Sequence, residues 1–185
     1  MPGSLALERS RRVFLQAAGR RRQNDALCTP RGCRFQKEVT MSMANTVSVD
    51  DQKRAIEQLM AYWSAHDLDR LLALFTDDAI YEDVTMGAVN RGAAELRAFG
   101  EGFFSGFPDV TFELRSAFAN GASGGAEWIL RGTHTGDLPG MPATRKRVEV
   151  RGASIIEFAG DKIRRCSDYW DMVAFLKQLG LMPPA

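Results

Sequence analysis

The chain has 185 residues, of which 45% are hydrophobic and 25% charged, the composition of an ordinary globular domain rather than of a disordered or fibrous chain. Lys and Arg total 24 against 23 Asp and Glu, so the formal net charge is +1. This balance gives no basic footprint for nucleic acid, and no apolar run approaches the roughly 20 residues that span a bilayer.

The first 40 residues differ from the rest in charge. They hold nine Lys or Arg and three Asp or Glu, a balance of +6, which leaves 24 − 9 = 15 basic and 23 − 3 = 20 acidic residues, a balance of −5, for the remainder. Residues 10–19 (SRRVFLQAAG) resemble a twin-arginine export signal, but three arginines follow where such a signal needs an apolar segment. We therefore interpret residues 1–45 as a basic, disordered leader, or as translated sequence upstream of a true start at Met41 or Met43. Export or organelle targeting is the alternative, and residues 46–185 are expected to form the folded domain.

The three cysteines, Cys28, Cys33 and Cys166, show no framework spacing. An odd number of cysteines without such spacing is typical of a reducing compartment, so a cytoplasmic location is expected. Cys28 and Cys33 lack a second pair of ligands, and the chain has only two histidines, so we predict no metal site.

The first half of the domain has helical periodicity. Ser48 and Asp51 form a helix start, and apolar residues recur at Ile56, Leu59 and Trp63, which predicts a helix over residues 50–65. Further helices are predicted over residues 68–75 and 93–104, with a short strand over 79–84 and a loop over 86–92.

From Val110 onward the apolar period changes to two. Strands are predicted over residues 110–118, with Phe118 pointing inward, and over 126–134, 147–158 and 162–170, before a short closing helix over 171–179. Helices followed by meandering strands indicate an α+β fold.

An isolated carboxylate stands on the inner face of the last strand. Alternation places Cys166, Asp168 and Trp170 on one face, and Ser154 on the inner face of the strand before it. A carboxylate on such an apolar surface is costly to bury unless it is paired or used, so Asp168 is the first candidate for chemistry. The alternative is a structural ion pair with Arg131, Arg164 or His134.

Several motifs together resemble one family. They are GTHTG at residues 132–136, LPGMP at 138–142, KIRRCSDYWDMVAFLKQLG at 162–180, LFTDDAIYEDV at 74–84 and GFPDVTFEL at 106–114. They resemble the SnoaL-like polyketide (ester) cyclases of the nuclear transport factor two-like superfamily, over roughly Asp50 to Leu181. The resemblance implies a cone-shaped, curved mixed β-sheet wrapped around N-terminal helices, an α+β barrel whose open end is an apolar cavity.

The same resemblance assigns chemistry to two residues. Asp168 matches the aspartate that takes a proton from an activated carbon and returns it to the oxyanion of an aldol closure, without metal or organic cofactor. Burial raises the pKa of an aspartate, which makes its carboxylate a stronger base near neutral pH. His134 matches a histidine near the cyclase pocket, where it could donate a hydrogen bond to a substrate carbonyl or orient Asp168. A histidine satisfied by backbone groups at a strand end is the alternative.

Two positions depart from the family pattern. Ser154 stands where the cyclases carry a histidine beside the catalytic aspartate, and a hydroxyl cannot become a cation. Trp63 stands where one member has a tyrosine that contacts ligand, although packing in the core is the simpler interpretation of its helical spacing. Both departures leave an aromatic polyketide substrate in doubt.

Four further residues are candidates for substrate binding. Tyr81 and Asp83 can face the pocket together, where a second carboxylate would favour one proton shared with Asp168; a solvated cluster at a strand end is the alternative. Trp128 and Trp170 can form pocket walls for a flat apolar ligand, or can be ordinary core aromatics.

These observations lead to two hypotheses. The first is a cofactor-independent acid/base enzyme that acts on a small, largely apolar or aromatic carbonyl compound, by cyclisation, isomerisation or hydrolysis. The second is a non-catalytic ligand-binding or dimerisation module of the same fold. No nucleic acid or membrane partner is expected. An outer sheet face with Ile129, Ile155 and Ile163 predicts a homodimer.

Overall fold

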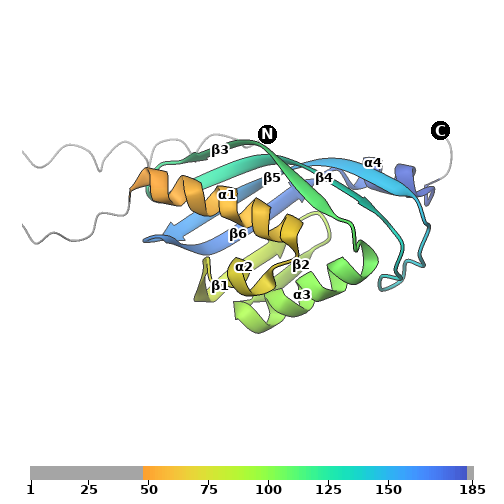
Figure 1. Cartoon of the computed structure of the whole chain (residues 1–185), viewed down its shortest axis with the longest axis horizontal. Coiled ribbons are helices and arrows are strands. Elements are labelled where there is room, and N and C mark those ends of the chain that lie inside the picture. The colour runs from red at the N-terminus through yellow and green to blue at the C-terminus, as the bar shows by residue number, and fades with distance from the viewer. Residues whose placement is uncertain (1–47, 183–185) are drawn as a thin grey trace, which may run out of the picture. The chain divides into compact units, whose positions relative to one another are not determined.

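The computed structural model describes residues 48–182, so the predictions for the leader over residues 1–45 and its two cysteines lie outside the described residues. The helices are α1 (Val49–Ala65), α2 (Leu68–Leu72), α3 (Gly92–Gly106) and α4 (Met172–Leu179). The strands, drawn in Figure 1, are β1 (Phe75–Asp83), β2 (Ala88–Arg91), β3 (Thr111–Ala119), β4 (Ser123–Thr133), β5 (Arg147–Ala159) and β6 (Lys162–Trp170).

The strands form one mixed sheet in the order β2-β1-β6-β5-β4-β3. Strands β1 and β6 run parallel, and the other neighbouring pairs are antiparallel. The sheet curves but does not close, because β2 and β3 remain as its two edges (Figure 1). Helix α1 packs on β3, α3 on β1 and α4 on β5. The predicted α+β architecture, with a curved mixed sheet wrapped around N-terminal helices, is confirmed.

Helix α1 begins where the sequence predicts its cap. The Asp51 backbone N–H donates to the Ser48 hydroxyl at 3.0 Å, and the Ser48 N–H donates to the Asp51 carboxylate at 3.3 Å, which completes a capping box. The apolar stripe that includes Ile56, Leu59 and Trp63 is buried. Burial of each such side chain is worth about 1.5–3 kcal/mol relative to exposure, and it fixes the helix that carries Trp63.

The predictions for residues 68–75 and 86–92 were wrong in part. Helix α2 ends at Leu72, and Phe75 already begins β1 by pairing with Ile163 of β6. Residues 88–91, predicted as loop, form β2 and pair with β1. Both differences arise from pairing with another strand, which overrides local propensity.

Two irregularities in strand register reverse the predicted faces of two residues. The β3–β4 register shifts between Leu114 and Ser116, so Phe118, predicted to point inward, is 58% exposed. The β5–β6 register shifts next to Phe158, and Ile163, predicted on the outer face, is fully buried. An extra residue in a strand moves the side chains beyond it to the other face. The apolar residues exposed on the outer face of the sheet therefore include Phe118 and do not include Ile163.

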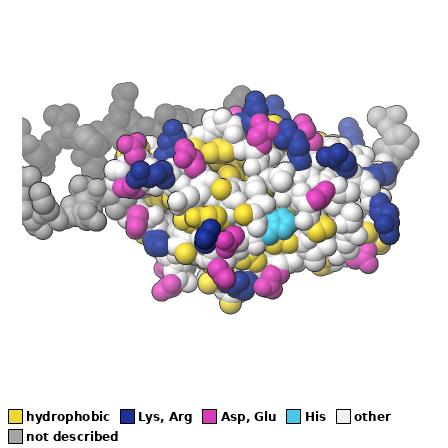
Figure 2. All heavy atoms as spheres, in the orientation of Figure 1, with side chains coloured by type: hydrophobic (Ala, Val, Ile, Leu, Met, Phe, Trp, Pro, Cys, Tyr) yellow, Lys and Arg dark blue, Asp and Glu magenta, His cyan; other side chains and the backbone are white. Residues whose placement is uncertain are grey.

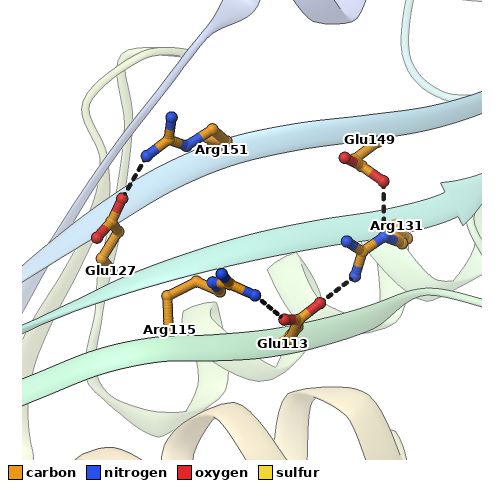
Figure 3. A network of polar contacts seen from close by, with 6 residues as sticks. All are labelled: Glu113, Arg115, Glu127, Arg131, Glu149 and Arg151. Atoms are coloured by element: carbon orange, nitrogen blue, oxygen red, sulfur yellow. Dashed lines mark hydrogen bonds and ion pairs between the residues drawn. The ribbon is translucent and has the colours of Figure 1, made fainter.

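The outer face of β3, β4 and β5 carries cross-strand ion pairs (Figure 3). Arg131 donates to Glu113 at 2.6 Å and to Glu149 at 2.7 Å. Arg151 donates to Glu127 at 2.6 Å. Pairs this exposed contribute at most about 1 kcal/mol each. Because Arg131 makes its ion pairs on the outer face of the sheet, it does not pair with Asp168 on the inner face.

On the face drawn in Figure 2, acidic and basic side chains are interspersed, and apolar side chains show between them. Mixed charge of this kind is typical of a solvated protein surface. Within residues 48–182, no helix is both long and apolar enough to cross a membrane.

Candidate active site

A cavity of about 380 Å³ lies between the inner face of the sheet and helices α1, α3 and α4. Its wall is mostly apolar, and many of its lining residues are aromatic: Trp63, Tyr81, Phe99, Phe103, Phe107, Phe112, Trp128, Trp170 and Phe175. Asp83 and Asp168 are the only charged side chains among its described lining residues. A concave, mostly apolar pocket with few polar groups is the usual form of a small-molecule site.

Asp168, on β6, is held at both carboxylate oxygens. The Tyr81 hydroxyl donates to Oδ2 at 2.6 Å, and the Ser154 hydroxyl donates to Oδ1 at 2.6 Å. The Cys166 thiol lies 3.5 Å from Oδ1. Asp168 is 7% exposed, and no Lys, Arg or His among the described residues pairs with it. The structural ion pair considered from the sequence is therefore absent from the described part of the chain.

Strand register sets this geometry. Ser154 and Asp168 are direct partners in the antiparallel β5–β6 ladder, so their side chains leave the same face side by side. Tyr81 comes from β1, which runs parallel to β6 on its other side. Trp128, on β4, donates its Nε1–H to the Ser154 hydroxyl at 2.9 Å. The indole, the hydroxyl and the carboxylate thus form a relay of hydrogen bonds across three strands.

Burial raises the pKa of Asp168 above its ordinary value. The hydrogen bonds donated by Ser154, Tyr81 and Cys166 oppose this rise, because they stabilise the carboxylate form. The nearby Asp83 carboxylate adds to it through charge repulsion. Burial also raises the pKa of Tyr81 well above its ordinary value, so the phenol stays protonated and remains a donor. The site therefore holds a carboxylate that is more basic than a solvated one.

Asp83 faces the same cavity from the end of β1. The Trp170 Nε1–H lies 3.0 and 3.1 Å from its two oxygens, and the Met86 backbone N–H donates at 2.9 Å. Burial raises the pKa of Asp83, while these donors lower it. Glu82, between Tyr81 and Asp83, points outward and pairs with Arg165, as alternation predicts. Each cavity carboxylate keeps its own donors, and no hydrogen bond joins the two.

Trp63 carries a free donor. Its benzene edge lies against α3, since a Cβ added at Gly100 would be 3.5 Å from Cζ3. The opposite edge of the indole holds Nε1–H, which has no hydrogen-bond partner in the described part of the chain. The corresponding groups of Trp128 and Trp170 are both engaged. Trp63 is 2% exposed and lines the cavity, so it both packs in the core and borders the candidate site.

His134 lies apart from Asp168. Its ring is fully buried and stacks on Phe107, with centroids 5.0 Å apart. Its Nδ1 accepts from the Thr144 backbone N–H at 3.3 Å and lies 3.2 Å from the Thr144 hydroxyl. His134 is not among the residues that line the cavity, whereas Phe107 is. Its Nε2 is buried without a hydrogen-bond partner among residues 48–182, so the neighbouring groups satisfy only one of the two ring nitrogens. No hydrogen bond joins His134 to Asp168 in this part of the chain.

The cavity unites most of the predicted site residues, namely Trp63, Tyr81, Asp83, Trp128, Asp168 and Trp170. Ser154 lies behind Asp168 rather than on the cavity wall, and His134 lies behind Phe107. The roles assigned to all these residues stay predictions.

Sequence reasoning missed the rest of the wall. Leu138 and Met141 come from the loop after β4, and Met172 and Phe175 come from α4. The LPGMP motif and the three-residue spacing of Met172 and Phe175 on a closing helix were signals that could have found them. Among residues 48–182, no group of three or more His, Cys, Asp or Glu could hold a metal ion.

A family model described as SnoaL-like polyketide cyclase matches residues 53–179. No curated protein matches the chain. Among solved structures, AclR, a proposed hydroxylase from Streptomyces galilaeus, is similar with 22% identity and a TM-score of 0.65 over 75% of this chain and 90% of that one.

Two other solved structures are similar. A proposed SnoaL-like polyketide cyclase from Jannaschia sp. CCS1 has 18% identity and a TM-score of 0.66 over 72% of this chain and 94% of that one. A Catenulispora acidiphila protein with a ketosteroid isomerase-like fold, in complex with trimethylamine, has 20% identity and a TM-score of 0.60. The match covers 70% of this chain and 97% of that one. At such identities the likeness shows the fold alone.

Proposed function

Because the chain belongs to the SnoaL-like polyketide cyclase family, we propose that it is a cofactor-independent acid/base enzyme acting on a small, largely apolar carbonyl compound. Asp168 is the proposed proton-transfer group. The observation that carries this proposal is a buried carboxylate that has no cationic partner within residues 48–182 and is held by Tyr81 and Ser154 in an aromatic cavity.

The proposed reaction begins with proton abstraction next to a carbonyl. The Asp168 carboxylate takes a proton from the α-carbon, the C–H bond breaks, and its electron pair moves into an enolate. In a cyclase, the enolate carbon then attacks a second carbonyl of the same molecule, and the proton on Asp168 returns to the new oxyanion. In an isomerase, the proton returns to another carbon. Either sequence restores the carboxylate and needs no outside reagent.

The surroundings of Asp168 support this role. Its raised pKa makes the carboxylate a stronger base, while the two hydroxyl donors keep it ionised over a useful pH range. Trp63 Nε1–H is the group proposed to donate to the substrate carbonyl oxygen, where negative charge develops. His134 is proposed only to support Phe107 in the wall, because it does not line the cavity.

The experiment is hydrogen–deuterium exchange at the α-carbon of a flat ketone, 2-tetralone, followed by proton NMR in D₂O. Wild type is expected to accelerate exchange, and Asp168→Asn to lose about 10²–10⁴-fold of that acceleration, the usual contribution of a general base. Asp78→Asn, which removes an exposed carboxylate from β1, is the matched control and should keep the wild-type rate. If 2-tetralone binds both wild type and Asp168→Asn but neither accelerates exchange, the non-catalytic binding module is favoured instead.

We also propose that two copies of the chain pair through the outer face of the sheet. Phe118, Ile155 and Tyr169 are exposed there, around an open hollow of about 710 Å³. An apolar group of this kind on an otherwise charged face favours a symmetric partner surface. The expected cytoplasmic location stays a prediction.

A further inference from the structure

The side chains that line the cavity offer a ligand few hydrogen-bond donors. The Tyr81 hydroxyl already donates to Asp168, and the Trp170 Nε1–H donates to Asp83. The Trp128 Nε1–H donates to the Ser154 hydroxyl, behind the wall. Trp63 Nε1–H is therefore the one lining side-chain donor without a partner among the described residues. What remains for a ligand is aromatic faces, carboxylate lone pairs and a single N–H.

The cavity is also unbalanced in charge. Its described lining residues include two carboxylates and no Lys, Arg or His. The cations of neighbouring strand positions are engaged outside it, since Arg165 pairs with Glu82 and Arg164 with Glu157, each at 2.6 Å. Carboxylates withdrawn from water without a countercharge attract a cation strongly.

We propose that Asp83 is a substrate-binding carboxylate and that the cavity selects ligands bearing a cationic nitrogen over neutral or anionic ones of the same shape. This inference deepens the proposed function, because it names the class of carbonyl compound that the same cavity would accept. The aromatic wall contributes to the same preference, since ring faces attract cations, and it admits an ammonium group with alkyl substituents.

The position of Asp83 suits this role. Asp83 and Asp168 are direct partners in the parallel β1–β6 ladder, so a ligand that contacts one carboxylate lies next to the other. Trp170 and Met86 fix the orientation of Asp83 but leave lone pairs on both of its oxygens. A cationic nitrogen held there would also stabilise the enolate that forms when Asp168 removes a proton, which the single free N–H of Trp63 does only in part.

The test is calorimetric titration of the full chain with two esters that differ only in charge, acetylcholine and 3,3-dimethylbutyl acetate, and with monoethyl succinate as an anion. At pH 8 we expect acetylcholine to bind about tenfold more tightly than its neutral isostere, the order expected for a partly desolvated cation on carboxylate and aromatic groups. Monoethyl succinate should not bind measurably. Asp83→Asn should abolish the preference, and Asp78→Asn should keep it.

Equal or tighter binding of the neutral ester, or a preference that survives in Asp83→Asn, would overturn the inference. If Asp83→Asn does not fold, the wild-type protein still decides the matter: the preference for acetylcholine must shrink as the pH is lowered and the carboxylates protonate, and a constant preference contradicts the proposal. The exchange assay with 2-tetralone is independent of this result. Loss of exchange in Asp168→Asn without any preference for cations would leave the proposed function standing and remove only this inference.

Discussion

At the scale of single residues, Asp168 is held where ionisation is unfavourable. Burial raises its pKa in the folded protein, whereas the unfolded chain has the ordinary value of about 3.9. Between these two values the folded protein binds more protons than the unfolded chain does. Folding stability linked to this group is therefore fully present below the unfolded pKa and is lost as the pH rises through the folded pKa.

Replacing Asp168 with Asn removes this pH-dependent loss of stability, while its amide offers only one acceptor oxygen to the hydroxyls of Tyr81 and Ser154. The difference in free energy of unfolding between variant and wild type should be constant below about pH 4. It should shift in favour of the variant as the pH rises to the folded pKa, by no more than about 1.4 kcal/mol per pH unit for one proton, and be constant again above that value. Urea unfolding of both proteins from pH 4 to pH 8 measures this difference. Curves that stay parallel throughout would show that Asp168 ionises in the fold as easily as in the unfolded chain.

At the scale of elements, β5 makes room for the relay of hydrogen bonds that reaches Asp168. Gly152 is the direct cross-strand partner of Trp128, and a Cβ at position 152 would lie 2.2 Å from Trp128 Cη2. The absent side chain lets the indole lie over the backbone of β5, so its Nε1–H reaches Ser154 two residues further along. The pairing of β4, β5 and β6 thus positions the hydrogen bonds that hold Asp168.

Gly152→Ala should consequently displace Trp128, destabilise the fold by about 1–3 kcal/mol through overpacking, and reduce 2-tetralone exchange. Gly102→Ala, on α3, is the comparison, because a Cβ there meets nothing within 4 Å. That variant should be about 0.4–1 kcal/mol more stable than wild type. Thermal unfolding and the exchange rate report both changes, and a Gly152→Ala protein as stable and active as wild type would remove the steric argument.

The sequence predicted most of this element structure and much of the cavity wall. Alternation placed Asp168, Ser154 and Trp170 correctly, because residues 152–157 of β5 and 165–170 of β6 pair in unbroken register, beyond the irregularity next to Phe158. The faces of Phe118 and Ile163 were missed because strand register slips at bulges, which depend on the partner strand rather than on local periodicity.

The sequence could not predict where the His134 ring lies, for a related reason. Its place in the strand-end motif is local information, but whether its ring meets Asp168 depends on how Phe107 and Thr144 pack around it. The sequence also could not show that the Trp63 Nε1–H lacks a hydrogen-bond partner, because this depends on which acceptors the fold places near the indole.

At the scale of the whole molecule, the proposed dimer depends on the apolar residues exposed on the outer face of the sheet. Ile155 and Tyr169 are about half exposed on β5 and β6, and Phe118 lies on the edge strand β3. Stable interfaces bury at least about 1,200 Å² in total, so a dimer must also cover part of the charged strands around this apolar group.

Light scattering behind size exclusion should give a mass of about 41 kDa, twice the 20.5 kDa of one chain. Ile155→Glu should shift the mass toward one chain, because an unpaired charge would be buried at the interface. Val173→Glu, at a comparably exposed position on α4, should leave the dimer intact. A single-chain mass for wild type at tens of micromolar would contradict pairing through this face.

NMR titration of the Asp168 carboxyl carbon, with the Asp168→Asn spectrum as assignment control, measures whether this carboxylate is a buried base. We expect a midpoint above the ordinary aspartate value, a further rise in Ser154→Ala, where a donor to the carboxylate is lost, and another rise when 2-tetralone fills the cavity. A midpoint at the ordinary value, unmoved by the substitution and by the ketone, would mean that this carboxylate meets bulk water and is not the buried base proposed here.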